Sequence, residues 1–260
     1  MNDLSKYTVL ITGAASGNGF GIASCCMNYF MNLILVDKDK NGLLSAKSKL
    51  LSQKQIGNNF QSLETIDCDL SNSDELDELI YQLKTKQKTI HCLVNNAGIS
   101  LPINEKMTLK NKLEIWDQTL KVNLTAPYHL AIGLEQLIPD KVGTIINITS
   151  LNSTLAFPNN PSYMASKGGL KQLSMSLATD LSHREIRVNS IAPGYFKTNM
   201  TKLSWEDKNK RNERSSKTLL KRWGMPDELG GTVCFLASRM SSYITGQEIY
   251  IDGGWSIKGL

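Results

Sequence analysis

Residues 7–19 read Tyr-Thr-Val-Leu-Ile-Thr-Gly-Ala-Ala-Ser-Gly-Asn-Gly. The first five residues form an apolar, β-branched run that predicts a buried strand, and the glycines that follow predict a tight turn into a helix. Glycine has no Cβ, so the backbone of such a turn can adopt positive φ and allows a pyrophosphate to approach closely. The helix would then offer its N-terminal amides and its dipole to the phosphates. The stretch therefore predicts a strand–turn–helix unit that binds a dinucleotide.

Short apolar runs of this kind recur along the chain and alternate with helix-length segments. Six more runs predict buried strands, at residues 33–36, 63–66, 92–94, 144–148, 188–191 and 248–251. Helices are predicted at residues 73–83, 113–137, 163–182 and 226–238, and Ser71 and Asp74 have the spacing of a capping box for the first of them. Seven strands that alternate with helices predict an α/β fold, a doubly wound, seven-stranded parallel sheet with helices on both faces.

Composition narrows the class of protein. The 260 residues are 41% hydrophobic and 20% charged, and no Pro-, Gly- or Ser-rich linker divides them, so we expect a single globular domain. The net charge of +5 comes without a basic stripe interleaved with aromatic residues, which argues against a nucleic-acid partner. No apolar run approaches the roughly 20 residues of a membrane span. An odd number of cysteines without Cys-x-x-Cys pairs indicates a reduced, cytoplasmic protein, and the three scattered histidines predict no metal site.

An acid follows the second predicted strand. Asp37 stands 18 residues beyond Gly19, where the ribose of an adenosine would present its hydroxyls. A carboxylate there accepts hydrogen bonds from a 2′-OH and repels a 2′-phosphate, and Ser16 supplies no compensating cation. Lys38 argues against this preference, because its ammonium could reach the 2′-phosphate of NADP. We therefore expect NAD to be favoured over NADP.

Tyr163 and Lys167 stand four residues apart, a spacing that places the phenol and the ammonium on one face of a helix. A nearby positive charge favours the phenolate, so we expect Lys167 to lower the pKa of Tyr163 from its ordinary value of about 10. Such a tyrosine could give or take a proton near neutral pH. By itself the pair fits equally well a surface tyrosine beside a solvated lysine.

Seven features in order resemble the short-chain dehydrogenase/reductase family over nearly the whole chain. They are the loop Thr12-Gly13-x-x-x-Gly17-x-Gly19, Asp69 in Cys68-Asp69-Leu70, the motif Asn95-Asn96-Ala97-Gly98, Asn123 in Lys121-Val-Asn-Leu, Ser150 thirteen residues before Tyr163, the pair Tyr163 and Lys167, and Pro193-Gly194 with Thr198. The resemblance implies a single NAD(P)-binding Rossmann domain over residues 1–260. It also implies hydride transfer between a nicotinamide cofactor and a secondary alcohol or ketone.

The resemblance also implies residue roles. Tyr163 exchanges the alcohol proton, Lys167 tunes that tyrosine and holds the nicotinamide ribose, Ser150 positions the substrate oxygen, and Asn123 holds a water in a proton relay. The implied cofactor-binding residues are Gly13, Ser16, Asn18, Gly19, Asp37, Asp69, Leu70, Asn96, Ala97, Gly98, Tyr163, Lys167, Pro193, Gly194 and Thr198. One departure is Asn18, a polar residue where the family usually has an aliphatic one near the nicotinamide. Another is the glycine-heavy helix start at Phe20-Gly21.

Three functions remain open. Residues 221–230, 235–238, 243–247 and 252–255 are similar to sugar-acid dehydrogenases such as gluconate 5-dehydrogenase, which favours a small polar sugar or sugar acid as substrate. The same residues also resemble 3-oxoacyl-carrier-protein reductases. The third alternative is a dinucleotide-binding sensor without turnover, against which the four implied catalytic residues argue. We expect residues 195–218, charged and poor in apolar side chains, to form an excursion over the substrate. The family further implies a homotetramer or a homodimer.

Overall fold

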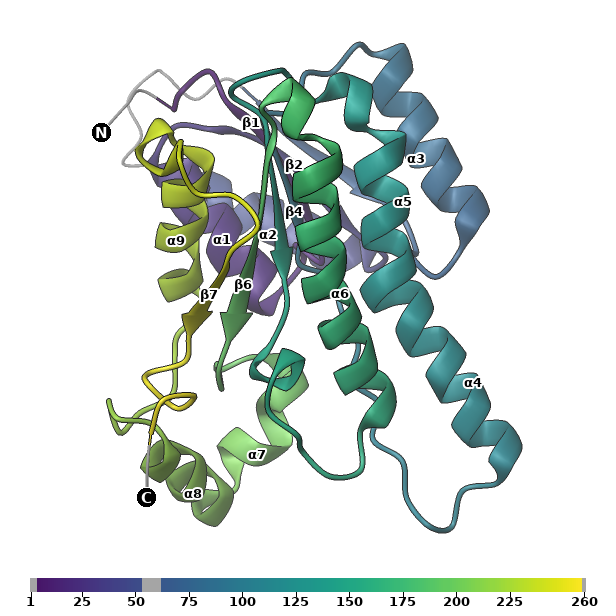
Figure 1. The fold of residues 1–260 in the computed structure, drawn as a ribbon, viewed down its shortest axis with the longest axis vertical. Helices are drawn as coiled ribbons and strands as arrows, with labels where there is room; N and C mark the ends of the chain where they lie inside the picture. The colour runs from purple at the N-terminus through teal and green to yellow at the C-terminus, as the bar shows by residue number, and fades with distance from the viewer. Residues whose placement is uncertain (1–3, 53–61, 259–260) are drawn as a thin grey trace.

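In residues 4–52 and 62–258, which the structure describes, the computed structural model forms a seven-stranded parallel sheet between two layers of helices (Figure 1). The strands lie in the order β3-β2-β1-β4-β5-β6-β7, and every neighbouring pair is parallel. They are β1 Thr8–Thr12, β2 Asn32–Asp37, β3 Leu63–Asp67, β4 Cys92–Asn95, β5 Thr144–Ile148, β6 Arg187–Pro193 and β7 Glu248–Ile251. All seven predicted strands are confirmed, and so is the fold class. The order reverses between β1 and β4, and at such a switch point a crevice forms beyond the carboxyl ends of the strands.

The helices lie on both faces of the sheet. They are α1 Gly17–Asn28, α2 Lys40–Ser52, α3 Ser73–Thr85, α4 Leu109–Leu120, α5 Ala126–Gly133, α6 Pro161–Asp180, α7 Lys202–Glu206, α8 Lys208–Lys217 and α9 Asp227–Ala237. On one face α1, α2 and α9 cover the strands, and on the other α3, α5 and α6 do so (Figure 1). Helices α7 and α8 lie within residues 195–218, the segment predicted to form an excursion.

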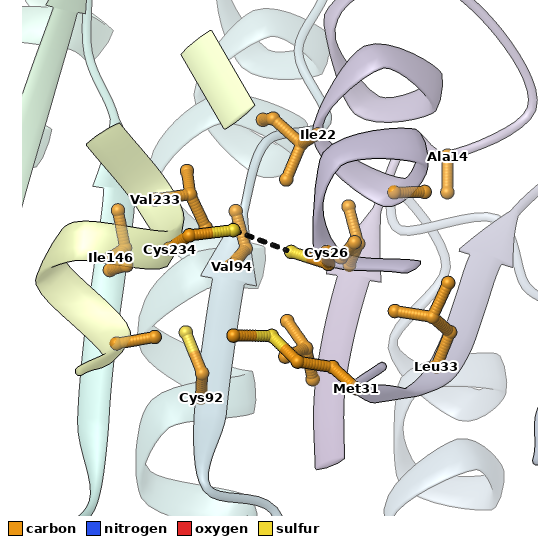
Figure 2. Close-up of a cluster of buried hydrophobic side chains, with 14 of the residues drawn as sticks. Ala14, Ile22, Cys26, Met31, Leu33, Cys92, Val94, Ile146, Val233 and Cys234 are labelled. Carbon is orange, nitrogen blue, oxygen red and sulfur yellow. Dashed lines mark hydrogen bonds between the residues drawn. The ribbon is translucent and has the colours of Figure 1, made fainter. Parts of the chain in front are cut away.

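Two apolar layers stabilise this arrangement, one on each face of the sheet. On the α1 and α9 face, Ile22, Val94 and Val233 pack together with Cys26 and Cys234, whose sulfur atoms lie 3.9 Å apart as free thiols (Figure 2). All five cysteines lie in the described part of the chain and are free. They pack as small apolar side chains, as expected for buried cysteine.

Two helix predictions need correction. The N-cap of α3 is Asn72, whose side chain accepts from the amide of Asp74 at 3.0 Å, so the predicted capping box from Ser71 does not form. Ser71 is turned instead toward Asp69, whose Oδ1 accepts from the Ser71 hydroxyl at 2.8 Å. The Ser71 hydroxyl therefore donates to Asp69, the acid after β3, and does not cap α3 as the sequence pattern predicts.

The predicted helix at 113–137 is interrupted. It begins earlier, at Leu109, and a π-helical segment, Lys121–Thr125, separates α4 from α5. Pro127 has no N–H and its ring clashes with the carbonyl four residues earlier, so an α-helical bond to Asn123 cannot form there. The widened turn relieves that clash, and π-bulges in helices are frequent at functional sites.

No helix in residues 4–52 or 62–258 is both long enough and apolar enough to cross a membrane.

Candidate active site

A cavity of about 290 Å³ opens at the switch point, beyond the carboxyl ends of β1 and β4. Ten of the predicted cofactor residues line it, namely Gly13, Ser16, Asn18, Asp37, Asp69, Leu70, Asn96, Ala97, Gly98 and Thr198. Cys68, Ile99, Val122, Asn199 and Met200 line it as well, and sequence reasoning missed them. Four of them are next to a predicted residue in the chain and Met200 lies two residues from Thr198, and that proximity was the only signal they carried.

The glycine-rich turn has the backbone that the sequence predicts. Gly13 and Gly17 have φ of +66° and +56°, which favour glycine. Gly19 does not line the cavity; a Cβ there would lie 2.1 Å from the carbonyl oxygen of Gly13. Its role is to let α1 pack closely on the turn. The Asn96 side chain donates to the carbonyls of Thr12 at 2.9 Å and Gly13 at 3.2 Å, so Asn96 holds the turn in place.

Asn18 supplies a test of whether the cavity fits a dinucleotide. Its Oδ1 is buried and has no hydrogen-bond partner among the described residues, although the residue lines the cavity. A buried polar atom without a partner is costly, so such an atom points to a bound group that satisfies it. The Asn18 oxygen accepts hydrogen bonds, so it fits a hydroxyl or amide donor of a dinucleotide. The positive-φ turn and the free amides at the start of α1 fit its phosphates.

Two acids and one lysine, Asp37, Asp69 and Lys38, also line the cavity. The Asp37 carboxylate accepts from the amide of Ala15 at 3.0 Å and from the amide of Asp39 at 3.1 Å. Lys38 Nζ lies 3.7 Å from Oδ2 of Asp69. The lysine is therefore paired with Asp69, and the carboxylate of Asp37 has no cation beside it in the described residues.

The four predicted catalytic residues come from three elements. Tyr163 and Lys167 lie on α6, Ser150 follows β5, and Asn123 lies in the π-helical segment. Lys167 is buried and donates to the carbonyl of Ile148 at 2.7 Å. A Cβ placed on Gly98 would lie 3.4 Å from both Lys167 Nζ and Asn123 Oδ1, so these two groups reach the wall of the nucleotide cavity.

The Asn123 side chain is occupied by protein groups. Its Oδ1 accepts from the amide of Ile99 at 2.8 Å, and its Nδ2 donates to the Ile99 carbonyl at 2.9 Å and to Ser166 Oγ at 3.1 Å. Both amide donors are used. Pro127 has no N–H and therefore cannot donate to the backbone carbonyl of Asn123.

The electrostatics of the pair on α6 differ from the prediction. Lys167 Nζ lies 5.8 Å from the centroid of the Tyr163 ring. Burial raises the pKa of Tyr163 above its ordinary value, and a hydrogen bond with Ser150 only partly opposes that effect. Burial also lowers the pKa of Lys167 to about 8. The expected lowering of the Tyr163 pKa by Lys167 is therefore wrong for this structure, because the cost of removing the phenolate from water dominates.

The remaining predicted residues lie at the end of β6. Pro193 ends that strand, and Gly194 packs against Asp252, whose Cα would be 2.8 Å from an added Cβ. Neither lines the nucleotide cavity, whereas Thr198 does.

Aromatic residues surround this corner of the site. The Tyr195 ring stacks on Trp255 at 5.2 Å between centroids and meets the edge of Trp223 at 5.3 Å. Tyr195 is close enough to Tyr163 that its charge contributes to raising the pKa of Tyr163. Sequence reasoning missed these aromatic residues as site residues, and the only signal was that Tyr195 directly follows Gly194.

Comparison with known proteins places the chain among oxidoreductases. A family model described as enoyl-(acyl carrier protein) reductase matches residues 13–256. The 3-oxoacyl-[acyl-carrier-protein] reductase of Rickettsia bellii is 35% identical, with 98% of each chain covered. The 5-keto-D-gluconate 5-reductase of Escherichia coli K12 is 32% identical, again with 98% of each chain covered.

Solved structures that resemble this chain are also dehydrogenases. A putative gluconate dehydrogenase from Agrobacterium tumefaciens superposes with a TM-score of 0.90 at 28% identity, covering 99% of this chain and 98% of that one. A putative NAD(P)-dependent gluconate 5-dehydrogenase from Beutenbergia cavernae, with bound NADP, has a TM-score of 0.87 at 28% identity and covers 98% and 99% of the two chains. A 4-hydroxyisoleucine dehydrogenase complexed with NADH has a TM-score of 0.84 at 29% identity and covers 98% and 100%.

Proposed function

The chain belongs to the short-chain dehydrogenase/reductase family and is an NAD(P)-dependent oxidoreductase acting on CH–OH or keto groups. From this we propose that four residues carry the reaction, namely Asn123, Ser150, Tyr163 and Lys167. The observation that carries the proposal is their convergence beside the nucleotide cavity, where Lys167 and Asn123 both approach Gly98. The bound nicotinamide supplies the hydride chemistry. The protein contributes geometry and proton transfer.

Tyr163 exchanges the proton of the substrate oxygen. Because burial raises its pKa, Tyr163 is protonated at neutral pH and ready to donate to a ketone. Ser150 lies against it and orients the same oxygen. Lys167 holds its ammonium between Ile148 and the cavity wall, and the Asn123 backbone carbonyl offers a place for the water of the relay.

We propose a small polar hydroxy compound, a sugar or sugar acid, as the substrate. The likeness to the Escherichia coli 5-keto-D-gluconate 5-reductase and to the Agrobacterium tumefaciens structure supports this. A 3-oxoacyl-carrier-protein reductase is the second candidate, favoured by the identity to the Rickettsia bellii enzyme. The third alternative, a sensor without turnover, does not agree with membership of this oxidoreductase family, and a pure binder has no need of all four residues.

We propose that NAD is preferred over NADP. Support comes from Asp37, which faces the cavity without a neighbouring cation, while Lys38 is paired with Asp69. A carboxylate at this place repels a 2′-phosphate. Titration of the protein with NADH and with NADPH tests the preference directly.

Helices α7 and α8 are proposed to cover the substrate. They lie beyond the carboxyl ends of β6 and β7 (Figure 1), and Trp205 of α7 packs against Trp223 at 6.3 Å between centroids. Lys197 Nζ sits 3.4 Å from the centroid of the Trp205 ring. These contacts connect the covering helices to the aromatic residues around Tyr195.

We propose one domain over residues 1–260, assembled as a homotetramer or homodimer in the cytoplasm. Exposed large apolar side chains on α4, α5 and α6 support self-association, and they include Leu113, Trp116, Tyr128, Ile132 and Met175. The free, buried thiols fit a reducing compartment. Light scattering measures the assembly.

One screen tests the function. Purified protein is assayed with polyols, sugar acids and hydroxyacyl thioesters, and with the matching ketones, using both cofactors. Turnover of sugar acids supports the first candidate, and exclusive turnover of acyl thioesters replaces it with the second. The absence of turnover with every compound, together with cofactor binding, would refute both proposed substrate classes.

A further inference from the structure

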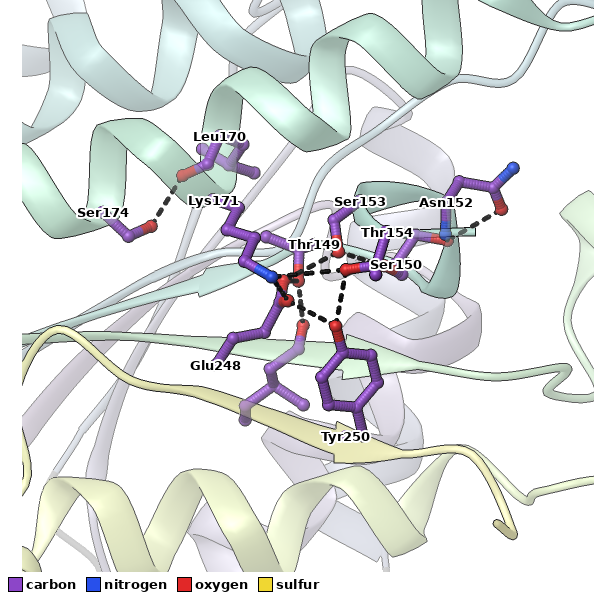
Figure 3. Close-up of polar contacts among 11 residues, drawn as sticks. Thr149, Ser150, Asn152, Ser153, Thr154, Leu170, Lys171, Ser174, Glu248 and Tyr250 are labelled. Atoms are coloured by element: carbon purple, nitrogen blue, oxygen red, sulfur yellow. Dashed lines mark hydrogen bonds and ion pairs between the residues drawn. The ribbon is translucent and has the colours of Figure 1, made fainter. Parts of the chain in front are cut away.

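Glu248 stands on the edge strand β7, yet only 5% of its side chain is exposed. Its Oε2 lies 2.7 Å from Nζ of Lys171 and accepts from the Tyr250 hydroxyl at 2.9 Å. Its Oε1 accepts from Thr149 Oγ1 at 2.8 Å and from Ser153 Oγ at 2.9 Å (Figure 3). Four donor groups thus surround one carboxylate. The single hydrogens of the Thr149 and Ser153 hydroxyls are shared with the carbonyls of Ile191 and Ser150.

This carboxylate joins the two segments that hold the proposed reacting groups. Thr149 and Ser153 lie on either side of Ser150 in the chain, and Ser153 Oγ also lies 2.7 Å from the backbone oxygen of Ser150. Lys171 lies on α6, one turn beyond Lys167, and therefore on the helix face that carries Tyr163. Glu248 bonds to both sides and lies between them (Figure 3).

The Glu248 carboxylate is charged although it is buried, and Lys171, its partner, is 34% exposed. Burial by itself raises the pKa of Glu248, but the hydrogen bonds from Lys171, Thr149 and Ser153 outweigh that effect and hold the pKa below its ordinary value. The titratable groups that face the carboxylate in the described residues are Lys171 and Tyr250. An ion pair that buries its carboxylate contributes little net stability compared with apolar packing, so a fixed geometry is the better account of its presence.

The Ser150 side chain depends on the position of its segment. Within the segment, Ser150 Oγ bonds to the amide and the side chain of Asn152, each at 3.1 Å. Those bonds move with the segment and do not attach it to α6. The bonds of Thr149 and Ser153 to Glu248, and of Glu248 to Lys171, attach the segment to α6. They act beside two direct bonds from α6, those of Lys167 to the Ile148 carbonyl and of Lys171 to Thr154 Oγ1.

We propose that Glu248 is a positioning residue that keeps Ser150 at a fixed place relative to Tyr163 by tying residues 149–153 to α6 through Lys171. The inference rests on the proposed function, since it assigns Glu248 to the same reaction. Substitution of Glu248 leaves the cofactor cavity untouched, because Glu248 does not line it.

The test compares Glu248→Gln with Glu64→Gln. Glu64 stands on β3, at the opposite edge of the sheet, and also pairs with a lysine, Lys88. We expect Glu248→Gln to lower kcat about 10- to 100-fold, because small misplacements of a positioning group cost rates of that order. NADH affinity should stay unchanged. Glu64→Gln should change neither quantity.

A pH profile separates positioning from a merely structural effect. The bond with Ser150 opposes the rise of the Tyr163 pKa, so displacement of Ser150 moves the midpoint of the pH–rate curve to higher pH. We expect that shift in Glu248→Gln and not in Glu64→Gln. A kcat unchanged by Glu248→Gln, or lowered equally by both variants, overturns the inference.

A double-mutant cycle that combines Glu248→Gln with Lys171→Met tests whether Glu248 acts through Lys171. If Lys171 connects Glu248 to α6, the double variant loses less than the product of the two single losses. Losses that simply multiply would count against the connection.

Crystal structures of both glutamine variants give a readout that needs no turnover. If Ser150 is displaced from Tyr163 in Glu248→Gln and not in Glu64→Gln, the inference is supported. This holds even if the wild type oxidises or reduces none of the compounds in the screen, a result that would refute only the proposed function. An unmoved Ser150 in Glu248→Gln refutes the positioning role whatever the activity.

Discussion

Replacing Gly19 with alanine should weaken cofactor binding while leaving the fold intact. The new Cβ would lie 2.1 Å from the carbonyl oxygen of Gly13 and 2.6 Å from Asn96 Nδ2. Cβ contacts in real proteins essentially never fall under 3.0 Å, so something must move. The nearest atom is a backbone oxygen of the glycine-rich turn, which cannot swing away as the end of a flexible side chain can.

The magnitude follows from that overlap. Relieving it requires a shift of about 1 Å between α1 and the turn, and overpacking of this kind typically costs about 1–3 kcal/mol. If the shift distorts the turn, each 1.4 kcal/mol or so weakens binding tenfold, so we expect NADH to bind roughly 10- to 100-fold more weakly. A loss of global stability of the same size would lower Tm by roughly 2–4 °C per kcal/mol.

The assay is NADH fluorescence titration beside thermal unfolding, and Gly231→Ala is the control. Gly231 also lies in a helix, α9, but no heavy atom outside its own helix turn comes within 4 Å of the Cβ that alanine would add. That variant should bind NADH as the wild type does and be at least as stable, because alanine has the higher helix propensity. Wild-type affinity in Gly19→Ala would refute the close-approach account of the turn.

Four further predictions concern the reaction, the cofactor, the pH dependence of stability and the assembly. Tyr163→Phe should bind NADH normally and lose most turnover, roughly 10²- to 10⁴-fold, as expected for a lost proton-transfer group; a fully active variant would disprove the assignment, and steady-state kinetics with titrated cofactor decide it. Asp37→Asn should narrow the preference for NADH over NADPH, and equal affinities in the wild type would remove the basis of the NAD assignment. Lys167→Met should be stabilised relative to the wild type at neutral pH, since burial lowers the folded-state pKa of Lys167 from 10.5 to about 8. Between these values the unfolded wild type binds more protons than the folded one, so wild-type stability rises with pH and the advantage of the variant shrinks from pH 8 to 10.5; denaturant titrations across this range that give a constant difference would contradict the burial effect. Trp116→Glu on the exposed face of α4 should shift the protein toward smaller assemblies in light scattering, whereas an unchanged mass would exclude that face as an interface.

The local pattern predicted much of the site because its parts are short-range. Gly13 and Gly17 precede a helix within a few residues, and positive φ at a strand-to-helix turn is a local requirement. Tyr163 and Lys167 share a helix face because they are four residues apart. The resemblance to a known family added Asn123 and Ser150, which no local pattern joins to the pair.

Other features depend on contacts that the pattern cannot express. The spacing of Ser71 and Asp74 fits a capping box, but Asp69 lies close enough to take the Ser71 hydroxyl, and Asn72 became the cap. The π-helical segment around Asn123 follows from Pro127, yet an amphipathic pattern over residues 113–137 reads as one continuous helix.

The sequence by itself determined the seven strands, the glycine-rich turn and the spacing of Tyr163 and Lys167, because these features rest on side-chain periodicity and backbone freedom over a few residues. Only the tertiary structure decided the direction of the Tyr163 pKa shift, since burial depends on what packs over the phenol and outweighs a lysine 5.8 Å from the ring centroid. It also brought Glu248 to Lys171 across 77 residues of chain, a contact that exists because β7 pairs with β6 at the edge beside α6.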